Sequence, residues 1–531
     1  MRGKVVLSLL AVAVPAPSAP APVAAQTLAD DDSVLRAIWD EAMSRSRIEP
    51  LAQSLLDSLG PRLTGSPGME RAQDWAVRML GGWGVDSGLE RYGTWEGWDR
   101  GPSHVDLVAP RVRSLEGQLL AWSPGTGGEP VEAEVTYLPQ LNFRTDWERF
   151  LEAVTGKWVL LSFPQPTCRP DEQWVRYQTD AAGLGIAQAR LDGEQRWSQG
   201  LRAATIASGG SGPGVAPVHA ALERAGAAGI ITSQWPGAPG TARVTEAYNR
   251  ATPTFELSCE DYGLVYRLAA NGQGPVLRLN AGAEHLGEVP VYNVVGRIPG
   301  TELPDEYVIL SAHFDSWDGA SGATDNGAGA LEMLEAIRVL TVAYPRPRRT
   351  LLITLWSGEE QGLNGSRAFV EDHPDIVEGL QALWNRDSGT GRVTLISAQG
   401  LVDVAAKLDE WLSNVPEEVP HHVDIERPGT PSGAGSDYSS FVCLGAPGIP
   451  LGSLSWDYTT HTWHSNRDTY DKLIFDDLRN NVVLVAALAY LASEEPELLS
   501  RRRRDMPTGR GGGGWPECGV AARSSPNAPG R

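Results

Sequence analysis

The chain has 531 residues, of which 41% are hydrophobic, a proportion that allows large cores and about two domains. Its formal net charge at pH 7 is −21, and because both ends of the chain are basic, the region between them is more acidic still. Such a surface repels nucleic acid and anionic membranes, which excludes both as expected partners.

Residues 1–25 have the composition of a secretory signal peptide. Arg2 and Lys4 precede an apolar run, and a Pro/Ala stretch ends in Val-Ala-Ala before Gln26. The apolar run is too short for an anchor helix, and several prolines follow it. We therefore expect cleavage after Ala25 and export to the periplasm or the extracellular medium, without a membrane span.

The rest of the chain divides into four segments. Residues 26–112 begin with helical patterns such as LRAIWDEAM and form the first part of a larger domain. Short β-like runs between Gly/Pro turns predict a mainly-β insert over residues 113–288. Strands and helices alternate over residues 289–497, which predicts an α/β domain with a mixed, mostly parallel sheet flanked by helices. The basic, Gly-rich residues 498–531 are predicted to be disordered.

Four cysteines lie far apart in the sequence. Export permits disulfides, and four cysteines allow three pairings. We expect Cys168 to pair with Cys259, whereas Cys443, in the apolar run SFVCLG, is equally well explained as a buried thiol. The chain has no CxxC motif, which excludes a zinc site built from thiolates.

Three predicted strands end in polar residues that are able to bind metals. YVILSAHFD ends at His313, TLLITLW runs into Glu359 and Glu360, and QALWNRD ends at Asp387. Ligands of open parallel sheets bind at the carboxyl ends of the strands, so we expect these side chains to meet at one edge. Two adjacent carboxylates in a poorly solvated place repel each other, and a bound cation removes that repulsion.

Two further segments add candidate ligands. Asp325 lies in the Gly-rich loop DGASGATDNGAGA, and His464 lies in HTWHSNRDTYDKL, where His461 is its rival. The resulting nitrogen and oxygen ligands exceed the three protein groups of one catalytic zinc and suit two metals about 3.5–4 Å apart. The predicted ligands are His313, Asp325, Glu360, Asp387 and His464. Each of them taken alone also suits a turn, a cap or a surface loop.

The same segments resemble a known family. HFDSWDGASGATDNGAGA, LWSGEEQGLNGSRAF, NRDSGTG and WHSNRDTYDKL are similar, in order and wording, to the M28 zinc metallopeptidases, in particular to the carboxypeptidase Q-like branch. The segments GKWVLLSF, ERAGAAGIITS and TPTFELSCEDYGLVYRL of the insert resemble a protease-associated (PA) domain. The resemblance implies a zinc exopeptidase fold, with a PA domain inserted over residues 113–288.

The resemblance also assigns roles to single residues. It implies that Asp325 bridges two Zn²⁺ ions, that His313 and Asp387 complete one ion, and that Glu360 and His464 complete the other. Glu359 is the implied general base for the metal-activated water, and Asp315 orients the imidazole of His313. A cis peptide bond is implied at Asp325-Asn326.

One further motif departs from the family. GAGSDYSSF matches its Gly-Ser-Asp-His stretch, which implies that Asp437 lies near the substrate. Tyr438 takes the place of the usual His, and we place both residues as candidate substrate contacts.

These observations predict an exported di-zinc exopeptidase that hydrolyses short peptides, as an aminopeptidase or dipeptidase. A carboxypeptidase acting on acidic C-terminal residues is the alternative within the same family. A non-catalytic, receptor-like protein on the same scaffold is disfavoured because all five ligands and Glu359 are present. The absence of a Gly-x-Ser-x-Gly motif argues against a serine hydrolase. The sequence leaves three roles open for the PA-like insert: it covers the site, recruits substrate or mediates formation of a homodimer.

Overall fold

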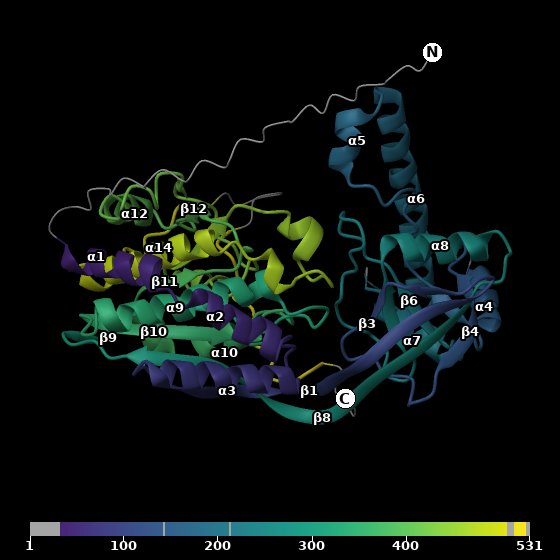
Figure 1. Cartoon of the computed structure of the whole chain (residues 1–531), viewed down its shortest axis with the longest axis horizontal. Helices are drawn as coiled ribbons and strands as arrows, with labels where there is room; N and C mark the ends of the chain where they lie inside the picture. The colour runs from purple at the N-terminus through teal and green to yellow at the C-terminus, as the bar shows by residue number, and fades with distance from the viewer. Residues whose placement is uncertain (1–31, 142–143, 212–213, 507–513, 527–531) are drawn as a thin grey trace, which may run out of the picture.

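The chain folds into two lobes joined by a long β-ribbon (Figure 1). The computed structural model describes residues 32–141, 144–211, 214–506 and 514–526. The predicted signal peptide lies outside the described residues. Within those ranges, none of the helices has the length and apolar character needed to cross a bilayer.

The larger lobe holds a mixed sheet in the order β13-β12-β14-β11-β9-β10-β8. β9, β10, β11 and β14 are parallel where they pair, whereas β8 runs antiparallel to β10 and β12 runs antiparallel to β14. The strands are β8 (Val276–Ile298), β9 (Leu303–His313), β10 (Arg349–Trp356), β11 (Leu380–Asn385), β12 (Val393–Ser397), β13 (Asp424–Glu426) and β14 (Gly448–Ser453). The predicted mixed, mostly parallel sheet is therefore confirmed.

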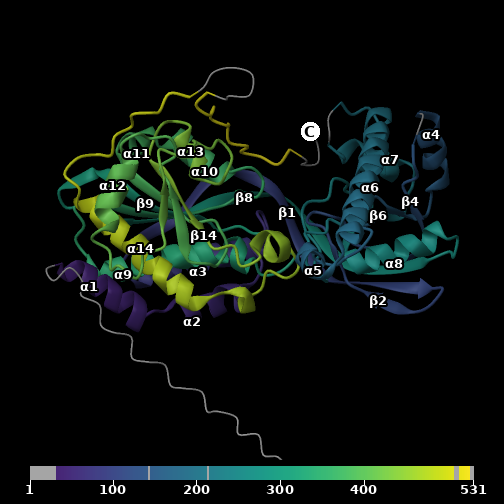
Figure 2. The same cartoon turned by 90° about the horizontal axis from the view of Figure 1, so that it is seen from above.

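Helices cover both faces of this sheet (Figure 2). Those of the larger lobe are α1 (Ser33–Trp39), α2 (Ile48–Ala52), α3 (Pro67–Gly82), α9 (Ala328–Ala343), α10 (Asn364–Asp372), α11 (Pro374–Glu378), α12 (Val404–Leu412), α13 (Ser439–Val442) and α14 (Phe475–Glu494). Side chains alternate along β9: Val308 and Leu310 join the core that contains α9 and α14, and Tyr307 and Ile309 join the core beneath α10 and α13. This period of two buries both faces of the strand, as expected for a central parallel strand.

A two-stranded ribbon connects the lobes. β1 (Asp86–Ala109) pairs antiparallel with β8 along almost its whole length, from Asp86 opposite Arg297 to Ala109 opposite Val276. Both strands pass from the larger into the smaller lobe (Figure 1). The expected domain border at 288 lies within this ribbon, opposite Glu96, whereas the border at 112 lies beyond its far end, after Ala109. A single continuous sheet extends through both lobes.

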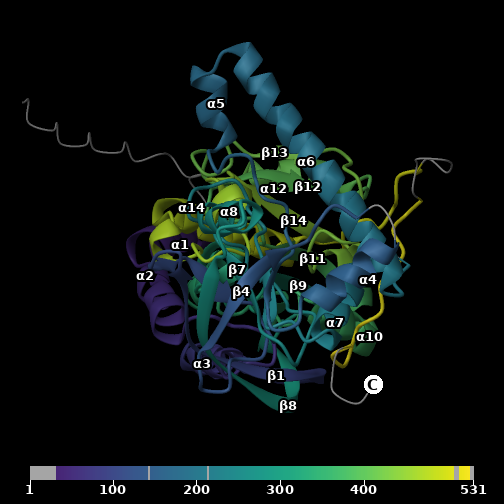
Figure 3. The same ribbon diagram turned by 90° about the vertical axis from the view of Figure 1, so that its right-hand side faces the viewer.

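The smaller lobe corresponds to the expected insert but is not mainly β. Its sheet continues from β8 in the order β4-β5-β6-β7-β3. Its strands are β2 (Arg113–Leu115), β3 (Gly117–Leu119), β4 (Val131–Tyr137), β5 (Trp158–Leu160), β6 (Gly229–Thr232) and β7 (Thr254–Leu257), and its helices are α4 (Arg144–Ala153), α5 (Asp171–Tyr177), α6 (Asp180–Ala207), α7 (Ala216–Arg224) and α8 (Cys259–Ala270). The 28-residue α6 extends beyond the sheet (Figure 3) and is the main departure from the predicted β character. Its buried residues all lie near its C-terminal end, so its sequence shows no long apolar stripe.

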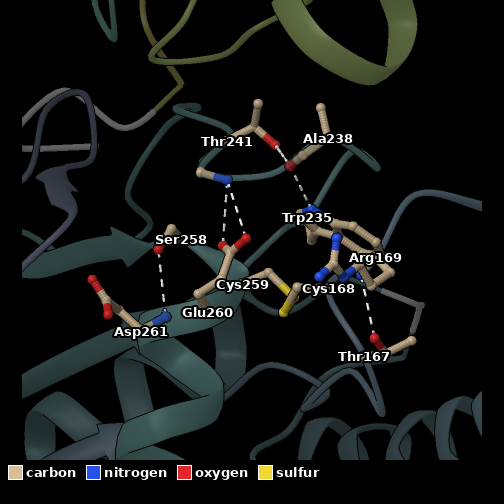
Figure 4. Close-up of a disulfide and its surroundings, with 11 residues drawn as sticks. Thr167, Cys168, Arg169, Trp235, Ala238, Thr241, Ser258, Cys259, Glu260 and Asp261 are labelled. Atoms are coloured by element: carbon tan, nitrogen blue, oxygen red, sulfur yellow. Dashed lines mark hydrogen bonds between the residues drawn. A yellow bond between two sulfur atoms is a disulfide. The ribbon is translucent and has the colours of Figure 1, made fainter. Parts of the chain in front are cut away.

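Two disulfides tie distant segments together. The expected Cys168–Cys259 bond is present at the start of α8, beside the loop that carries Trp235 and Thr241 (Figure 4). Cys443 forms a second disulfide with Cys518, so the alternative of a buried thiol at Cys443 is wrong.

The second disulfide also corrects the prediction of a disordered tail. Residues 514–526, which we call the C-terminal strap, lie against the larger lobe: the Arg523 carbonyl accepts a hydrogen bond from the backbone of Thr94 (2.9 Å), and its guanidinium pairs with Glu371 and Asp372. Trp515 donates from its indole nitrogen to the Val442 carbonyl (2.8 Å). The basic composition of this segment did not predict its order correctly, because acidic residues on the surface of the same chain pair with its arginine.

Candidate metal centre

Three neighbouring parallel strands bring the predicted site residues to one sheet edge. β9 ends at His313, which lies opposite Trp356, the last residue of β10, and β11 ends two residues before Asp387. Glu359 and Glu360 follow β10 in the turn that leads to α10. The carboxyl ends of the strands therefore deliver a histidine and three carboxyl groups to the same place.

The first cluster consists of His313, Asp325 and Asp387. The Nε2 atom of His313 lies 3.4 Å from Oδ1 of Asp325 and 3.5 Å from Oδ1 of Asp387. The His313 side chain is 1% exposed, so this cluster is shielded from bulk water.

The second cluster consists of Asp325, Glu360 and His464. The Nε2 atom of His464 lies 3.3 Å from Oδ2 of Asp325 and 3.0 Å from Oε2 of Glu360. Asp325 thus faces one histidine with each of its two oxygens, and the two clusters share this carboxylate.

The donor atoms fit metal ions. Within each cluster, one ligand atom from every residue lies within 4.8 Å of the others. Nε2 of His313, Oδ2 of Asp325 and Oε1 of Glu360 are buried and have no hydrogen-bond partner among the described residues. Burial, followed by the charge of Asp325, raises the pKa of Glu360 to about 7. Buried polar atoms without partners and carboxylates that repel each other both raise the free energy of the folded protein, and a cation bound between them removes this cost.

Asp315 supports this centre without belonging to either cluster. Its carboxylate accepts hydrogen bonds from the backbone N–H groups of Glu359 and Glu360 (both 3.3 Å) and from the hydroxyl of Thr64 (3.2 Å). Its backbone carbonyl lies 3.0 Å from Nδ1 of His313, on the side of the ring opposite the cluster. Asp315 therefore holds both the imidazole and the Glu359-Glu360 turn in place.

The loop that carries Asp325 is held by two buried residues. The carboxylate of Asp468 accepts hydrogen bonds from the backbone N–H groups of Thr324 (2.7 Å) and Asp325 (3.0 Å). Arg62, which is 0% exposed, donates to the carbonyls of Phe314 (2.6 Å) and Gly322 (2.9 Å). The expected cis peptide bond between Asp325 and Asn326 is present.

Glu359 is half-buried beside the clusters and is a member of neither. Its burial, together with the neighbouring carboxylates of Asp387 and Glu360, raises the pKa of Glu359 well above its usual value. A carboxyl group that binds a proton readily and is free of the clusters is suited to general base chemistry.

The smaller lobe contacts the segment that carries His464. The backbone N–H of Val244 donates to the carbonyl of His464 (2.7 Å), and the backbone N–H of Ala242 donates to the side-chain oxygen of Asn466 (2.9 Å). His464 has a positive φ of 55°, a strained conformation for a non-glycine residue. His461, the rival candidate, lies outside both clusters.

The two candidate substrate contacts are both buried. Asp437 is 0% exposed, and Tyr438 is 9% exposed with its ring in the core beneath α10 and α13. Their contact with a substrate stays a prediction.

Sequence reasoning did not identify Arg62, Thr64 or Tyr458 as part of the centre. Burial and the negative charges of Asp325 and Asp387 raise the pKa of Tyr458 well above its usual value, so its phenol stays protonated. Arg62 and Thr64 come from the turn-rich link GPRLTGSPG, where a single arginine among turn residues gives no recognisable signal.

A mixed α/β sheet that gathers histidine and carboxylate side chains beside its strand ends defines a metal-dependent hydrolase. Residues 293–489 match the model of peptidase family M28. Carboxypeptidase Q of Homo sapiens is 26% identical over 479 residues, which cover 88% of this chain and 89% of the relative. Carboxypeptidase Q of Xenopus laevis is 28% identical over 470 residues, with coverage of 88% and 89%.

Solved structures agree with this assignment. The peptidase M28 precursor of Shewanella amazonensis SB2B is 25% identical and has a TM-score of 0.64, over 90% of this chain and 98% of that one. The zinc aminopeptidase BSAP of Bacillus subtilis, 16% identical, shares the fold with a TM-score of 0.53 over 86% of this chain and 98% of its own. The resemblance of the catalytic motifs to the M28 peptidases is thereby confirmed, whereas the resemblance of the insert to a PA domain stays a prediction.

Proposed function

We propose that the protein is an exported di-zinc exopeptidase that removes N-terminal residues from short peptides, as an aminopeptidase or dipeptidase. The observation that carries the proposal is the sharing of Asp325 between two clusters that each contain a histidine. Nitrogen and oxygen donors without sulfur favour zinc among the common catalytic metals. His313 and Asp387 would hold one ion, Glu360 and His464 would hold the other, and Asp325 would contribute to both sites because it belongs to both clusters.

Bound zinc supplies positive charge that activates water near neutral pH and polarises a peptide carbonyl. Glu359 takes the proton of the attacking water and returns it to the leaving amine, because it lies half-buried beside the clusters and is not engaged by them. Asp315 keeps the Glu359 backbone in place through the 3.3 Å hydrogen bond that it accepts. The protonated phenol of Tyr458 is a donor for the negative charge that develops on the substrate oxygen.

The preference for a free substrate amino group rests on charge. The centre is rich in carboxyl groups, and the chain carries a net charge of −21, which favours a cationic N-terminus over a C-terminal carboxylate. The names of the carboxypeptidase Q relatives keep a carboxypeptidase as the second candidate. Dipeptides, N-acetylated dipeptides and aminoacyl anilides separate the two, because only an aminopeptidase loses its substrate on acetylation and cleaves the anilide.

The cellular location follows from two features. The predicted signal peptide at residues 1–25 directs export, and the Cys168–Cys259 and Cys443–Cys518 disulfides suit an oxidising compartment. For the insert we retain the relation to PA domains, and the contact of its Val244 with His464 supports a role beside the active site.

The decisive experiment combines elemental analysis of the purified protein with peptide hydrolysis. We expect about two zinc equivalents per chain, loss of activity after chelation, and recovery on adding zinc back. Full activity in metal-free protein contradicts the proposal.

A further inference from the structure

A cavity of about 160 Å³ lies between the two lobes, next to the candidate metal centre. Glu360 and Gln361 form its wall on the side of the centre, and Trp95, Trp122 and Trp317 supply most of its apolar lining. Its volume is about half that of the smallest pockets that enclose a drug-sized ligand, so it suits one side chain and excludes a longer segment of peptide.

Trp317 connects the cavity to the centre. Its ring lies edge-on to Trp122 and to the imidazole of His464, with centroid distances of 6.0 Å in both cases. A group that occupies the cavity therefore lies beside two of the residues assigned to the second metal, Glu360 and His464. This adjacency places the cavity within reach of a substrate held at the metals.

Two polar side chains of the wall are unsatisfied. The indole nitrogen of Trp317, a residue only 8% exposed, has no hydrogen-bond partner among the described residues. The amide nitrogen and oxygen of Gln361 are also buried without a partner within the same ranges. Buried donors and acceptors of this kind are normally satisfied by a ligand or by water.

The charges around the cavity are already balanced. Arg250 donates to both carboxylate oxygens of Glu96, at 2.9 Å from Nε and 2.9 Å from Nη2. Burial raises the pKa of Glu246 above its ordinary value, which favours its neutral form. Glu360 is assigned to the metal centre, so a charged side chain finds no free counter-charge among the residues that line the cavity, and its desolvation is uncompensated.

The C-terminal strap closes the remaining side. Ala522, Ser525 and Pro526 line the cavity, and Arg523, which lies between Ala522 and Ser525, anchors the strap. Gly93 of β1 allows this approach, because a Cβ atom built at Gly93 lies only 2.3 Å from the Arg523 carbonyl oxygen. The larger lobe, the smaller lobe and the strap thus each supply part of one enclosure.

We propose that this cavity is the specificity pocket for the side chain of the substrate's N-terminal residue, that it takes uncharged side chains of the size of leucine or glutamine, and that the C-terminal strap is one of its walls. This inference rests on the exopeptidase function proposed above. Trp317 and Gln361 are specificity-determining residues for the hydrogen-bonding part of such a side chain.

The test compares Gly93→Ala with Gly88→Ala, two equivalent changes on the same strand. A Cβ at Gly93 displaces the backbone of the strap, whereas a Cβ at Gly88 meets nothing within 4 Å. Steady-state kinetics are measured on X-Ala dipeptides with X = Gly, Leu, Gln, Lys and Glu. In the wild type we expect kcat/KM for Leu-Ala and Gln-Ala to exceed that for Gly-Ala by about tenfold or more, with Lys-Ala and Glu-Ala below Leu-Ala.

In Gly93→Ala, we expect the ratio of kcat/KM for Leu-Ala to kcat/KM for Gly-Ala to fall by about tenfold, while kcat/KM for Gly-Ala stays at the wild-type value. Gly88→Ala is expected to behave as wild type. An equal loss of kcat/KM for every dipeptide in Gly93→Ala, or a wild-type preference for dipeptides with charged X, overturns the pocket assignment and leaves the proposed function standing. A wild-type protein that hydrolyses none of the dipeptides overturns the proposed function and the pocket together.

Two further variants keep the inference testable if Gly93→Ala folds poorly. The double variant Cys443→Ser/Cys518→Ser removes the covalent anchor of the strap and is expected to reduce the same Leu/Gly ratio. Trp317→Phe keeps an aromatic wall and removes the indole N–H, so it is expected to lower kcat/KM for Gln-Ala several-fold more than for Leu-Ala. An unchanged Gln/Leu ratio in Trp317→Phe contradicts the role of the indole.

Discussion

The backbone N–H of Val244, in the smaller lobe, donates a 2.7 Å hydrogen bond to the backbone carbonyl of His464, in the larger lobe. The contact continues two residues further along, where Asn466 and Ala242 exchange hydrogen bonds of 2.9 and 3.0 Å. A segment of the insert therefore holds the backbone of a proposed metal ligand, so that insert and centre form one structural unit.

Asn466→Ala is expected to weaken the second metal position. The change removes the side-chain oxygen that accepts from Ala242 (2.9 Å) and loosens the backbone around His464. Loss of a supporting contact of this kind typically lowers metal affinity about 10–100-fold. Zinc retained after dialysis against graded chelator measures the effect. Asn466→Asp keeps an acceptor oxygen and serves as the control, and equal zinc loss in both variants argues against a positioning role.

Glu359→Gln is expected to keep both metals and to lose catalysis. The amide is close in shape to the carboxylate but does not accept a proton, so kcat falls on the order of a hundredfold or more with KM little changed. Zinc content and kcat are measured on the same preparation. Glu360→Gln is the contrast, because it alters a proposed ligand and reduces bound zinc. A fully active Glu359→Gln variant would falsify the assignment of the base.

The two histidines of the segment HTWHS provide a matched pair. His464→Ala removes the imidazole that lies 3.0 Å from Glu360, and we expect one of two zinc equivalents to be lost together with activity. His461→Ala changes a residue outside both clusters, and we expect it to keep both equivalents. If zinc is lost in His461→Ala and retained in His464→Ala, then His461 is the ligand and the assignment of His464 is wrong.

Glu256 is expected to make the stability of the smaller lobe depend on pH. Burial raises the pKa of this carboxyl group from its ordinary value of 4.5 to about 8. The folded state therefore holds the proton more tightly than the unfolded state, so the stabilisation is complete below about pH 4.5 and is lost as pH rises towards 8.

Glu256→Gln removes this dependence. The amide reproduces both contacts of the protonated acid, accepting from the backbone of Gln234 and meeting the hydroxyl of Thr232. Relative to wild type, we expect the variant to be neutral at pH 5 and more stable at pH 8, by on the order of 1–3 kcal/mol. Calorimetric unfolding at the two pH values measures the difference. Glu260→Gln, an exposed change nearby, is expected to follow wild type, and a pH-independent difference for Glu256→Gln contradicts the explanation.

The strand positions, the helix-flanked sheet of the larger lobe and the residues at the strand ends were accessible from sequence. Strands such as β10 are apolar from end to end, and the polar residues that follow them stand out locally. The same local reading did not reveal α6, whose few buried residues lie at one end, and it assigned disorder to residues that form the C-terminal strap.

Sequence by itself determined which residues are able to bind metal and where along the chain they occur, because residue type and strand periodicity are local properties. Only the tertiary structure decided that Arg62 and Thr64 support the centre, that the insert holds His464, and that the strap reaches the cavity beside Glu360. These contacts join segments tens to hundreds of residues apart. They depend on how two lobes pack across a shared sheet, and no local pattern in the chain encodes that packing.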